Sequence, residues 1–283
     1  MAESVNQVLL DTTVQNQRIA GGRGDREAVA QELAGVKVWT TSFVFREFLR
    51  TIIKDLHFLH DRSFVVGSPD DVRVAFAELL TGLASGKTFV PPRSAMRLLS
   101  IVGVILESFK TTRVRRKQLQ TRLERMCETW LDAFFQIREL NGSSTPVDCL
   151  TGLEESSAEW EDLRRGDPFP EMPAFPGGAA KFLENRRDEV RAAEQATTRA
   201  AAHQRDESLL RILGRLKRED GDYDFIGKLR PTTRGNWHLG DLLIALETPE
   251  GVSVYSRDKH FGVLCPALNK PQHRGTLNQQ GES

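Results

Sequence analysis

The sequence predicts an α/β fold, with a mainly parallel sheet that is flanked by helices and interrupted by a long helical insertion. Three observations predict it. Strand-like and helix-like segments alternate at the start of the chain, the same alternation returns near its end, and the region between them is almost entirely helical in pattern. Such alternation is typical of a parallel sheet with helices on its faces. At 283 residues, the chain suits one large domain or a core domain with a sizeable insertion.

The opening segment contains two predicted strands and two predicted helices. The apolar run VNQVLLD is a strand that ends at Asp11, and VKVWTTS, rich in Val and Thr, is a second strand. Between them we expect a glycine-rich loop and then a short helix that closes at Gly35. Ser42 is well placed to cap the helix FVFREFLRTIIKDLHFLH, whose apolar residues keep helical spacing.

The end of the chain resumes this pattern. NWHLGDLLIALET is a predicted helix, GVSVYSRD is a predicted strand after a Pro-Glu-Gly turn, and KHFGVL is a turn or short helix. Together with the opening segment, these residues form a predicted discontinuous core, which comprises residues 1–67 and 235–283.

Residues 68–234 form the predicted helical insertion. Its first helix is VRVAFAELLTGLAS, and a long helical pattern follows over residues 93–140. A second long helix is expected over residues 179–220, and the acidic, proline-rich segment at about 141–178 is expected to be a loop. The first long pattern carries one apolar stripe, formed by Leu119, Leu123, Met126, Trp130, Phe134 and Ile137.

Composition limits the possible functions. Lys plus Arg and Asp plus Glu are 39 each, so any basic surface for nucleic acid must come from local segregation of charge. The three cysteines are widely separated, which supports neither a disulfide framework nor a structural zinc site. The start of the chain does not have the pattern of a secretory signal, and the most apolar run, LLSIVGVILESF, is too short to span a bilayer. We therefore expect a cytoplasmic protein that does not bind a membrane.

Acidic residues occupy equivalent places in the predicted core. Asp11 and Asp258 each follow a strand, Asp241 begins a helix, and Glu47 lies in the first turns of another helix. Singly, each acid is more typical of a helix cap or a surface charge than of a metal ligand. Carboxyl ends of parallel strands share one edge with nearby helix N-termini, however, and carboxylates gathered there repel one another unless a cation neutralises them. The sequence therefore predicts a site for one or two Mg²⁺ or Mn²⁺ ions, which could activate a water and stabilise the leaving oxygen of a phosphodiester.

The same segments resemble those of the PIN-domain nucleases. VLLDTT resembles the opening strand of that family with its first acid, and TSFVFREF resembles the helix that carries the second acid. GDLLIALETPEGVSVYSRDKHFGVL resembles the closing stretch, in which Ser256, Asp258 and Phe261 fill the pattern Thr/Ser-x-Asp-x-x-Phe. The resemblance covers about residues 5–60 and 235–268, and the long insertion is a departure from the family pattern.

This resemblance implies a PIN-like core with metal-dependent nuclease activity, chiefly on RNA, and makes a toxin or defence role plausible. It implies that Asp11, Glu47, Asp241 and Asp258 hold the metal ions. Thr13 is then a supporting residue, together with Ser256, and both would orient a ligand carboxylate or a bound water.

A basic segment in the insertion is a candidate contact for nucleic acid. TTRVRRKQLQTRLER gathers basic side chains on a predicted helix, and such a stripe can neutralise phosphates along a backbone. An equally good interpretation is that these side chains face the acids of residues 154–162 or only solvate the helix. The residues concerned are Arg113, Arg115, Arg116, Lys117 and Arg122.

The function that these features predict is that of a metal-dependent endoribonuclease. Two alternatives remain open on the sequence. Carboxylate–metal chemistry does not itself sense the 2′-hydroxyl, so the substrate could be DNA. A non-catalytic interaction protein is the alternative from another class, in which the helical insertion binds a protein partner and the PIN-like core is a scaffold.

Overall fold

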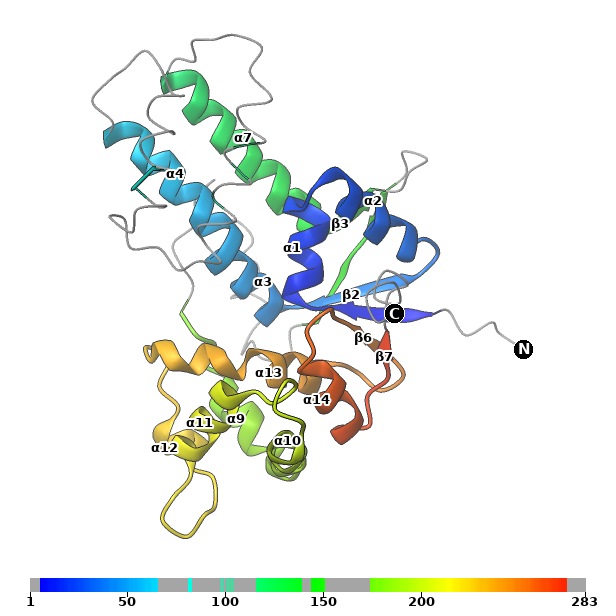
Figure 1. Ribbon diagram of the computed structural model, residues 1–283, viewed down its shortest axis with the longest axis vertical. Helices are drawn as coiled ribbons and strands as arrows, with labels where there is room; N and C mark the ends of the chain where they lie inside the picture. Colours follow the sequence, from blue (N-terminus) through cyan, green and yellow to red (C-terminus); the bar gives the residue numbers. More distant parts are fainter. Residues whose placement is uncertain are drawn as a thin grey trace. The chain divides into compact units, whose positions relative to one another are not determined.

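The computed structural model describes residues 6–65, 81–82, 98, 101, 103, 116–138, 144–150 and 174–273 (Figure 1). Contacts divide the chain into two compact units. The first comprises Met1–Glu47, Phe134–Arg165 and Pro173–Ser283, and the second comprises Phe48–Ala133 and Gly166–Met172. Each unit is described by itself below.

A five-stranded sheet forms the centre of the first unit. Its strand order is β5-β2-β1-β6-β7, and every pairing within it is parallel. The predicted α/β class, with a mainly parallel sheet flanked by helices, is therefore confirmed. The strands are β1 (Gln7–Leu10), β2 (Lys37–Thr41), β5 (Asp148–Leu150), β6 (Ser253–Tyr255) and β7 (Gln272–His273).

The strand order reverses direction beside β1. From β1 the chain moves outward to β2 and then to β5, and it returns to the other side of β1 to form β6 and then β7. In open parallel sheets, ligands bind outside the carboxyl ends of the strands at such a reversal. The carboxyl ends of β1 and β6 are thus where a site is expected.

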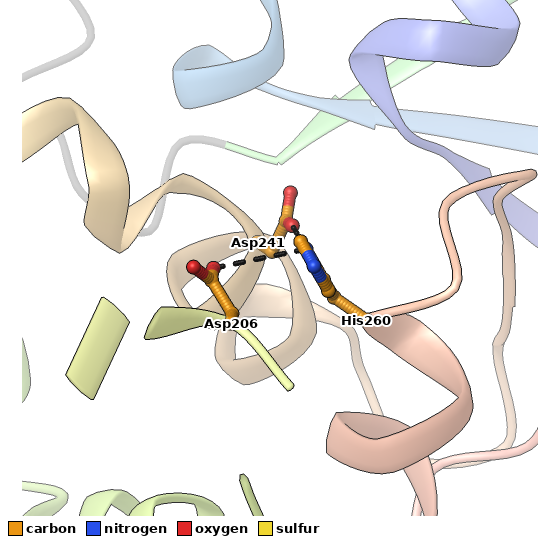
Figure 2. A group of neighbouring side chains, drawn as sticks. All are labelled: Asp206, Asp241 and His260. Carbon is orange, nitrogen blue, oxygen red and sulfur yellow. Dashed lines mark hydrogen bonds and ion pairs between the residues drawn. The ribbon is translucent and has the colours of Figure 1, made fainter. Parts of the chain in front are cut away.

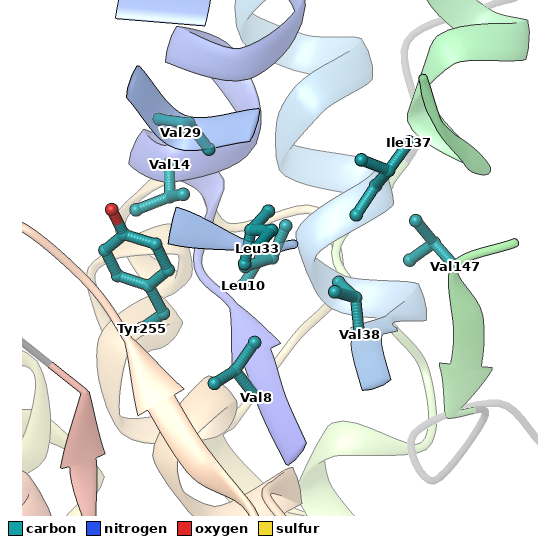
Figure 3. Close-up of a cluster of buried hydrophobic side chains, with 9 residues drawn as sticks. All are labelled: Val8, Leu10, Val14, Val29, Leu33, Val38, Ile137, Val147 and Tyr255. Atoms are coloured by element: carbon teal, nitrogen blue, oxygen red, sulfur yellow. The ribbon is translucent and has the colours of Figure 1, made fainter. Parts of the chain in front are cut away.

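One face of the sheet is covered by the first two helices, α1 (Thr12–Ala20) and α2 (Arg23–Glu32). Successive side chains of a strand point to opposite faces, so Val8 and Leu10 of β1 share this face. They form a buried cluster with Val14, Val29, Leu33, Val38, Ile137, Val147 and Tyr255 (Figure 3). Leu9, which points the other way, is also fully buried, as expected of a central strand covered on both faces.

The later helices of this unit lie on the opposite side of the sheet (Figure 1). Among them, α10 packs against α13 and α14, and α11 packs against a 3₁₀ helix, η2, which leads directly into α13. These helices are α9 (Ala179–Glu184), α10 (Arg187–Arg199), α11 (Glu207–Leu216), α12 (Phe225–Lys228), η2 (Arg234–Leu239), α13 (Gly240–Glu247) and α14 (Phe261–Ala267).

The second unit is helical where it is described. Helix α3 (Ser42–Phe48) leaves the first unit and continues through a π-helical turn, η1 (Leu49–Ile53), into α4 (Lys54–Val65). Helix α7 (Arg116–Phe134) lies beside α4, and His60 Nε2 of α4 is 3.4 Å from Glu124 Oε1 of α7. Most of the predicted helix from residue 72 to 85 lies outside the described residues.

Two local predictions near the start of the chain are wrong. The sequence predicts one helix between the first two strands, but residues 12–20 form a further helix, α1, before the glycines, because Asp11 caps this segment and Val14 and Ile19 bury its apolar side. The cap of α3 is Thr41 rather than Ser42, since the Thr41 hydroxyl accepts a hydrogen bond from the Val44 N–H at 3.2 Å.

The predicted long helix over residues 179–220 is also wrong, because the chain breaks it into α9, α10 and α11. The second break follows from Asp206, whose side chain accepts hydrogen bonds from the backbone N–H groups of Ser208 and Leu209 and so starts a new helix. The predicted loop at 141–178 contains β5 and also β4 (Ser144–Pro146), which pairs antiparallel with β3 (Gln136–Arg138). Among the described residues, no helix is long and apolar enough to cross a bilayer.

Candidate metal centre

Asp11 stands at the carboxyl end of the central strand and is only 2% exposed. Its carboxylate is held on both sides. Oδ1 accepts a hydrogen bond from the Val14 N–H at 2.8 Å, which makes Asp11 the N-cap of α1, and Oδ2 accepts one from the Ser256 hydroxyl. Burial is the main cause that raises the pKa of Asp11 from 3.8 to about 7; the two hydrogen bonds oppose it, and the charges of Asp241 and Asp258 act in the same direction as burial. The Asp11 carboxylate is thus fixed in place, and its negative charge is favoured only if a cation binds beside it.

Ser256 links the ends of the two adjacent strands. It follows β6, donates its hydroxyl hydrogen to Asp11, and accepts a hydrogen bond from the Asp258 N–H at 2.9 Å. Asp258 in turn accepts a hydrogen bond from the His260 N–H at 3.0 Å through Oδ1. The Ser-x-Asp spacing therefore places one hydroxyl between a strand-end carboxylate and the turn that carries the next carboxylate.

Asp241 lies in the first turn of α13 and is partly buried. Its Oδ2 is 3.2 Å from His260 Nδ1. Burial raises the pKa of Asp241, and the charges of Asp258 and Asp206 act in the same direction, whereas His260 opposes them.

Glu47, on α3, lies close to Thr12 and Gly240, which are adjacent in sequence to Asp11 and Asp241. The Thr12 hydroxyl donates to Glu47 Oε2 at 2.5 Å, and Thr12 directly follows Asp11. On the other side, a Cβ at Gly240 would lie only 3.0 Å from Glu47 Oε1, and Gly240 directly precedes Asp241. The missing side chain at position 240 thus leaves room for the Glu47 carboxylate.

The supporting threonine that the sequence predicts, Thr13, is exposed on α1. Its neighbour Thr12, which the sequence did not single out, is buried and contacts Glu47. Helical rotation explains this difference, since adjacent residues of a helix point about 100° apart. A one-residue shift therefore decides which threonine faces the acids.

Sequence reasoning missed two residues of the centre, Asp206 and His260. Asp206 caps α11 through Oδ1, which accepts from the Ser208 N–H at 2.9 Å and the Leu209 N–H at 3.0 Å, while its Oδ2 is 3.7 Å from His260 Nδ1. Figure 2 shows the side chains of Asp206, Asp241 and His260 pointing toward one another. The available signal was the N-cap pattern of an acidic residue before the amphipathic run ESLLRILGRL.

His260 faces acidic groups from three segments of the chain. Its Nδ1 is 3.2 Å from Asp241, 3.3 Å from Asp258 and 3.7 Å from Asp206. The hydrogen bond to Asp241 raises the pKa of His260, and the charges of Asp258 and Asp206 raise it further against the effect of burial. One ligand atom each from Asp206, Asp241 and His260 lie within 4.8 Å of one another, so this group could hold a metal ion.

The basic residues that the sequence predicts to contact nucleic acid lie in the second unit or outside the described residues. Lys117 and Arg122 are exposed on α7, and Arg116 is the first residue of that helix. Arg113 and Arg115 lie outside the described residues.

Comparison with known proteins identifies no relative. The chain matches no protein-family model, no curated protein and no solved structure. Membership of the PIN-domain family therefore remains a proposal that rests on the sequence patterns.

Proposed function

We propose that the protein is a divalent-metal-dependent nuclease with a PIN-like core, and that its preferred substrate is RNA. One observation carries the proposal. Asp11 is buried at the carboxyl end of the central strand, beside the strand reversal, where burial, and to a smaller extent the charges of neighbouring acids, raise its pKa to about 7. A buried carboxylate with a raised pKa, at the edge where parallel sheets bind ligands, is typical of a functional site.

The acids of this edge suit a hard divalent cation. Asp11, Glu47, Asp241 and Asp258 offer only oxygen atoms, which Mg²⁺ and Mn²⁺ prefer. Their orientation is supported by neighbouring groups, because Ser256 holds Asp11 and Thr12 holds Glu47. Hydrogen bonds of this kind fix the direction of metal ligands and preserve metal affinity.

The expected chemistry is hydrolysis of a phosphodiester. A bound divalent cation would supply a Lewis acid that lowers the pKa of water and offsets the negative charge of the phosphate. The chain's own residues hold the carboxylates in place: Val14 N–H and Ser256 fix Asp11, and the first turn of α13 presents Asp241. The resemblance to PIN-domain nucleases supports RNA as the substrate. Attack of water on the phosphorus with departure of the 3′-oxygen would leave a 5′-phosphate on the product.

A cleavage assay tests this proposal. Purified protein is incubated with end-labelled single-stranded RNA or DNA in Mg²⁺, Mn²⁺ or EDTA, beside the double variant Asp11→Asn/Asp258→Asn. Asparagine caps helices as well as aspartate does, so the variant is expected to fold. We expect metal-dependent cleavage of RNA that falls at least about 100-fold in the variant, the upper end of the loss caused by removing a group that only supports a ligand.

The matched control is Asp188→Asn, a carboxylate on α10 whose side chain is 95% exposed. It makes the same type of substitution once, away from the centre, and should leave cleavage unchanged. Cleavage in EDTA, or full cleavage by the double variant, would contradict the proposal. Cleavage of DNA alone would correct the substrate, and a folded protein that cuts neither nucleic acid would favour the non-catalytic interaction protein.

A further inference from the structure

We propose that Asp206, Asp241 and His260 form a second cation site, which binds a borderline transition-metal ion such as Mn²⁺ or Zn²⁺ in preference to Mg²⁺. The inference rests on the proposed function, since Asp241 would be shared with the oxygen-only site formed with Asp11, Glu47 and Asp258. It assigns roles to Asp206, which lies outside the stretches that resemble PIN-domain nucleases, and to His260, which fills a variable position of the pattern Thr/Ser-x-Asp-x-x-Phe.

The spacing of the ligand atoms suits one small ion. His260 Nδ1 is 3.2 Å from Asp241 Oδ2 and 3.7 Å from Asp206 Oδ2, and the three ligand atoms lie within 4.8 Å of one another. Ligands that are each about 2.1 Å from a tetrahedral ion lie about 3.4 Å from one another. The two observed distances lie on either side of this value, so small rotations of the side chains are sufficient for binding.

Each of the three ligands comes from the start of a different helix. Asp206 is the N-cap of α11, Asp241 lies in the first turn of α13, and His260 is the N-cap of α14 (Figure 2). The cap uses only Oδ1 of Asp206, which leaves Oδ2 directed at His260. Ligands on ordered helix starts lose little conformational freedom on binding, which favours a formed site.

The imidazole determines which ions the site accepts. Mg²⁺ takes oxygen ligands almost exclusively, whereas neutral imidazole is a good ligand for Zn²⁺ and other first-row transition metals. Asp258 is not counted as a ligand of this site, because its oxygen nearest to His260 Nδ1 is Oδ1, which already accepts a hydrogen bond from the backbone N–H of His260. In Asp206, by contrast, the oxygen that faces His260 is not the one that caps the helix. The site therefore offers one nitrogen and two carboxylates, while the carboxylates around Asp11 offer oxygen alone.

The competing arrangement involves no metal. A protonated His260 would itself neutralise the carboxylates of Asp206, Asp241 and Asp258, which all lie within 3.7 Å of its Nδ1. A cation that binds Nδ1 must displace this proton, so the two arrangements exclude each other. Direct detection of a metal–nitrogen bond distinguishes them.

The experiment measures binding of Mn²⁺ and Mg²⁺ to the full chain by calorimetry, with pulsed electron paramagnetic resonance of the Mn²⁺ form to detect ¹⁴N coupling. The test variants are His260→Gln alone and Asp206→Asn/His260→Gln, in which asparagine preserves the cap of α11. The control is His203→Gln, an exposed histidine on the loop that leads to Asp206. Thermal unfolding of each variant verifies that it is folded.

We expect ¹⁴N-coupled Mn²⁺ in the wild-type chain and in the control. Both test variants should lose this coupling and one of two Mn²⁺ sites, with little change in Mg²⁺ binding. Absence of ¹⁴N coupling in the wild-type chain, or its persistence in both folded variants, would overturn the inference.

Failure of this inference can be separated from failure of the proposed function. The variant Asp11→Asn/Glu47→Gln should lose nuclease activity and Mg²⁺ binding but keep the ¹⁴N-coupled Mn²⁺. If no nucleic acid is cut under any condition, the nuclease proposal fails while the ¹⁴N signal still decides whether the second site exists. If RNA is cut and no ¹⁴N coupling is found, only the second site is rejected.

Discussion

Asp11 and Asp206 perform the same local task in very different surroundings. Each caps a helix through Oδ1 and directs Oδ2 to another side chain, Ser256 for Asp11 and His260 for Asp206. Asp11 follows the central strand and is 2% exposed, whereas Asp206 follows a break between two helices and its side chain is 14% exposed. Helix capping therefore fixes the direction of an acid, and its burial and neighbours decide what it can bind.

This comparison divides the candidate centre into two halves. The strand half consists of Asp11, Glu47 and Asp258, and the helix half consists of Asp206 and His260. Asp241 lies between them, since it raises the pKa of Asp11 by its charge and hydrogen-bonds to His260. Variants that affect one half, the other or both test whether the halves act separately.

Asp241→Asn should have the largest effect, because it removes the residue that both halves share. We expect the cleavage rate to fall by at least about 100-fold and the binding of both Mn²⁺ ions to weaken together. Calorimetry and the RNA assay measure the two effects. Loss of only one Mn²⁺ site would mean that Asp241 belongs to one half alone and is not shared.

The burial of Asp11 in the strand half should make the free energy of unfolding depend on pH when no metal is present. The pKa of Asp11 is about 7 in the folded chain and 3.8 ordinarily, so between these values the folded chain keeps a proton that the unfolded chain has lost. The free energy of unfolding therefore falls as pH rises through this window, by up to about 4 kcal/mol from Asp11. The raised pKa of Asp241 and of His260 acts in the same direction.

Asp11→Asn isolates this contribution, because the other two groups remain. Urea unfolding in EDTA from pH 4 to pH 8 should show a shallower decline for the variant than for the wild-type chain. Saturating Mn²⁺ should stabilise the wild-type chain more at pH 8 than at pH 5, since the ion binds the ionised carboxylate. Parallel curves for the two chains would mean that Asp11 is not buried as described.

Much of the strand half could be predicted from the sequence. The strand patterns VNQVLLD and GVSVYSRD locate the ends of β1 and β6, and parallel sheet geometry then brings Asp11 and Asp258 to one edge. The choice between Thr12 and Thr13 could not be predicted, because it depends on helix rotation at a boundary that pattern fixes only to within a residue or two.

The sequence carries only a weak signal of the helix half, the cap pattern at Asp206, for two physical reasons. The uniform helical pattern of residues 179–220 hides the break at which Asp206 caps α11, and a single side-chain cap decides that break. The contact between Asp206 and His260 also joins residues far apart in the sequence through packing of α10 against α14. Strands β5 and β7 were missed for a similar reason, since their few residues are defined by pairing with distant strands.

Gly240→Ala should disturb the strand half through Glu47. The added Cβ would lie 3.0 Å from Glu47 Oε1 and 3.1 Å from Phe43 Cε1, so the carboxylate must move. We expect RNA cleavage and Mg²⁺ affinity to fall between about 10-fold and 100-fold, while the ¹⁴N-coupled Mn²⁺ of the helix half persists.

The matched control for this variant is Gly214→Ala in α11, where no atom lies within 4 Å of the added Cβ. That change should raise the free energy of unfolding by about 1 kcal/mol through helix propensity and leave activity intact. Equal activity of the two variants would show that the position of Glu47 is unimportant.

Thr12→Val should have the smallest effect. It removes the 2.5 Å hydrogen bond to Glu47 but keeps the size and branching of the side chain, so only the orientation of one carboxylate is weakened. A loss of roughly threefold to tenfold in the rate of RNA cleavage corresponds to the net value of one hydrogen bond. Thr12→Ser should restore most of the activity, and Thr13→Val, at the exposed neighbouring position, should have no effect. If activity falls only in Thr13→Val, then Thr13 and not Thr12 orients the acids, which is the role that the sequence predicts for Thr13.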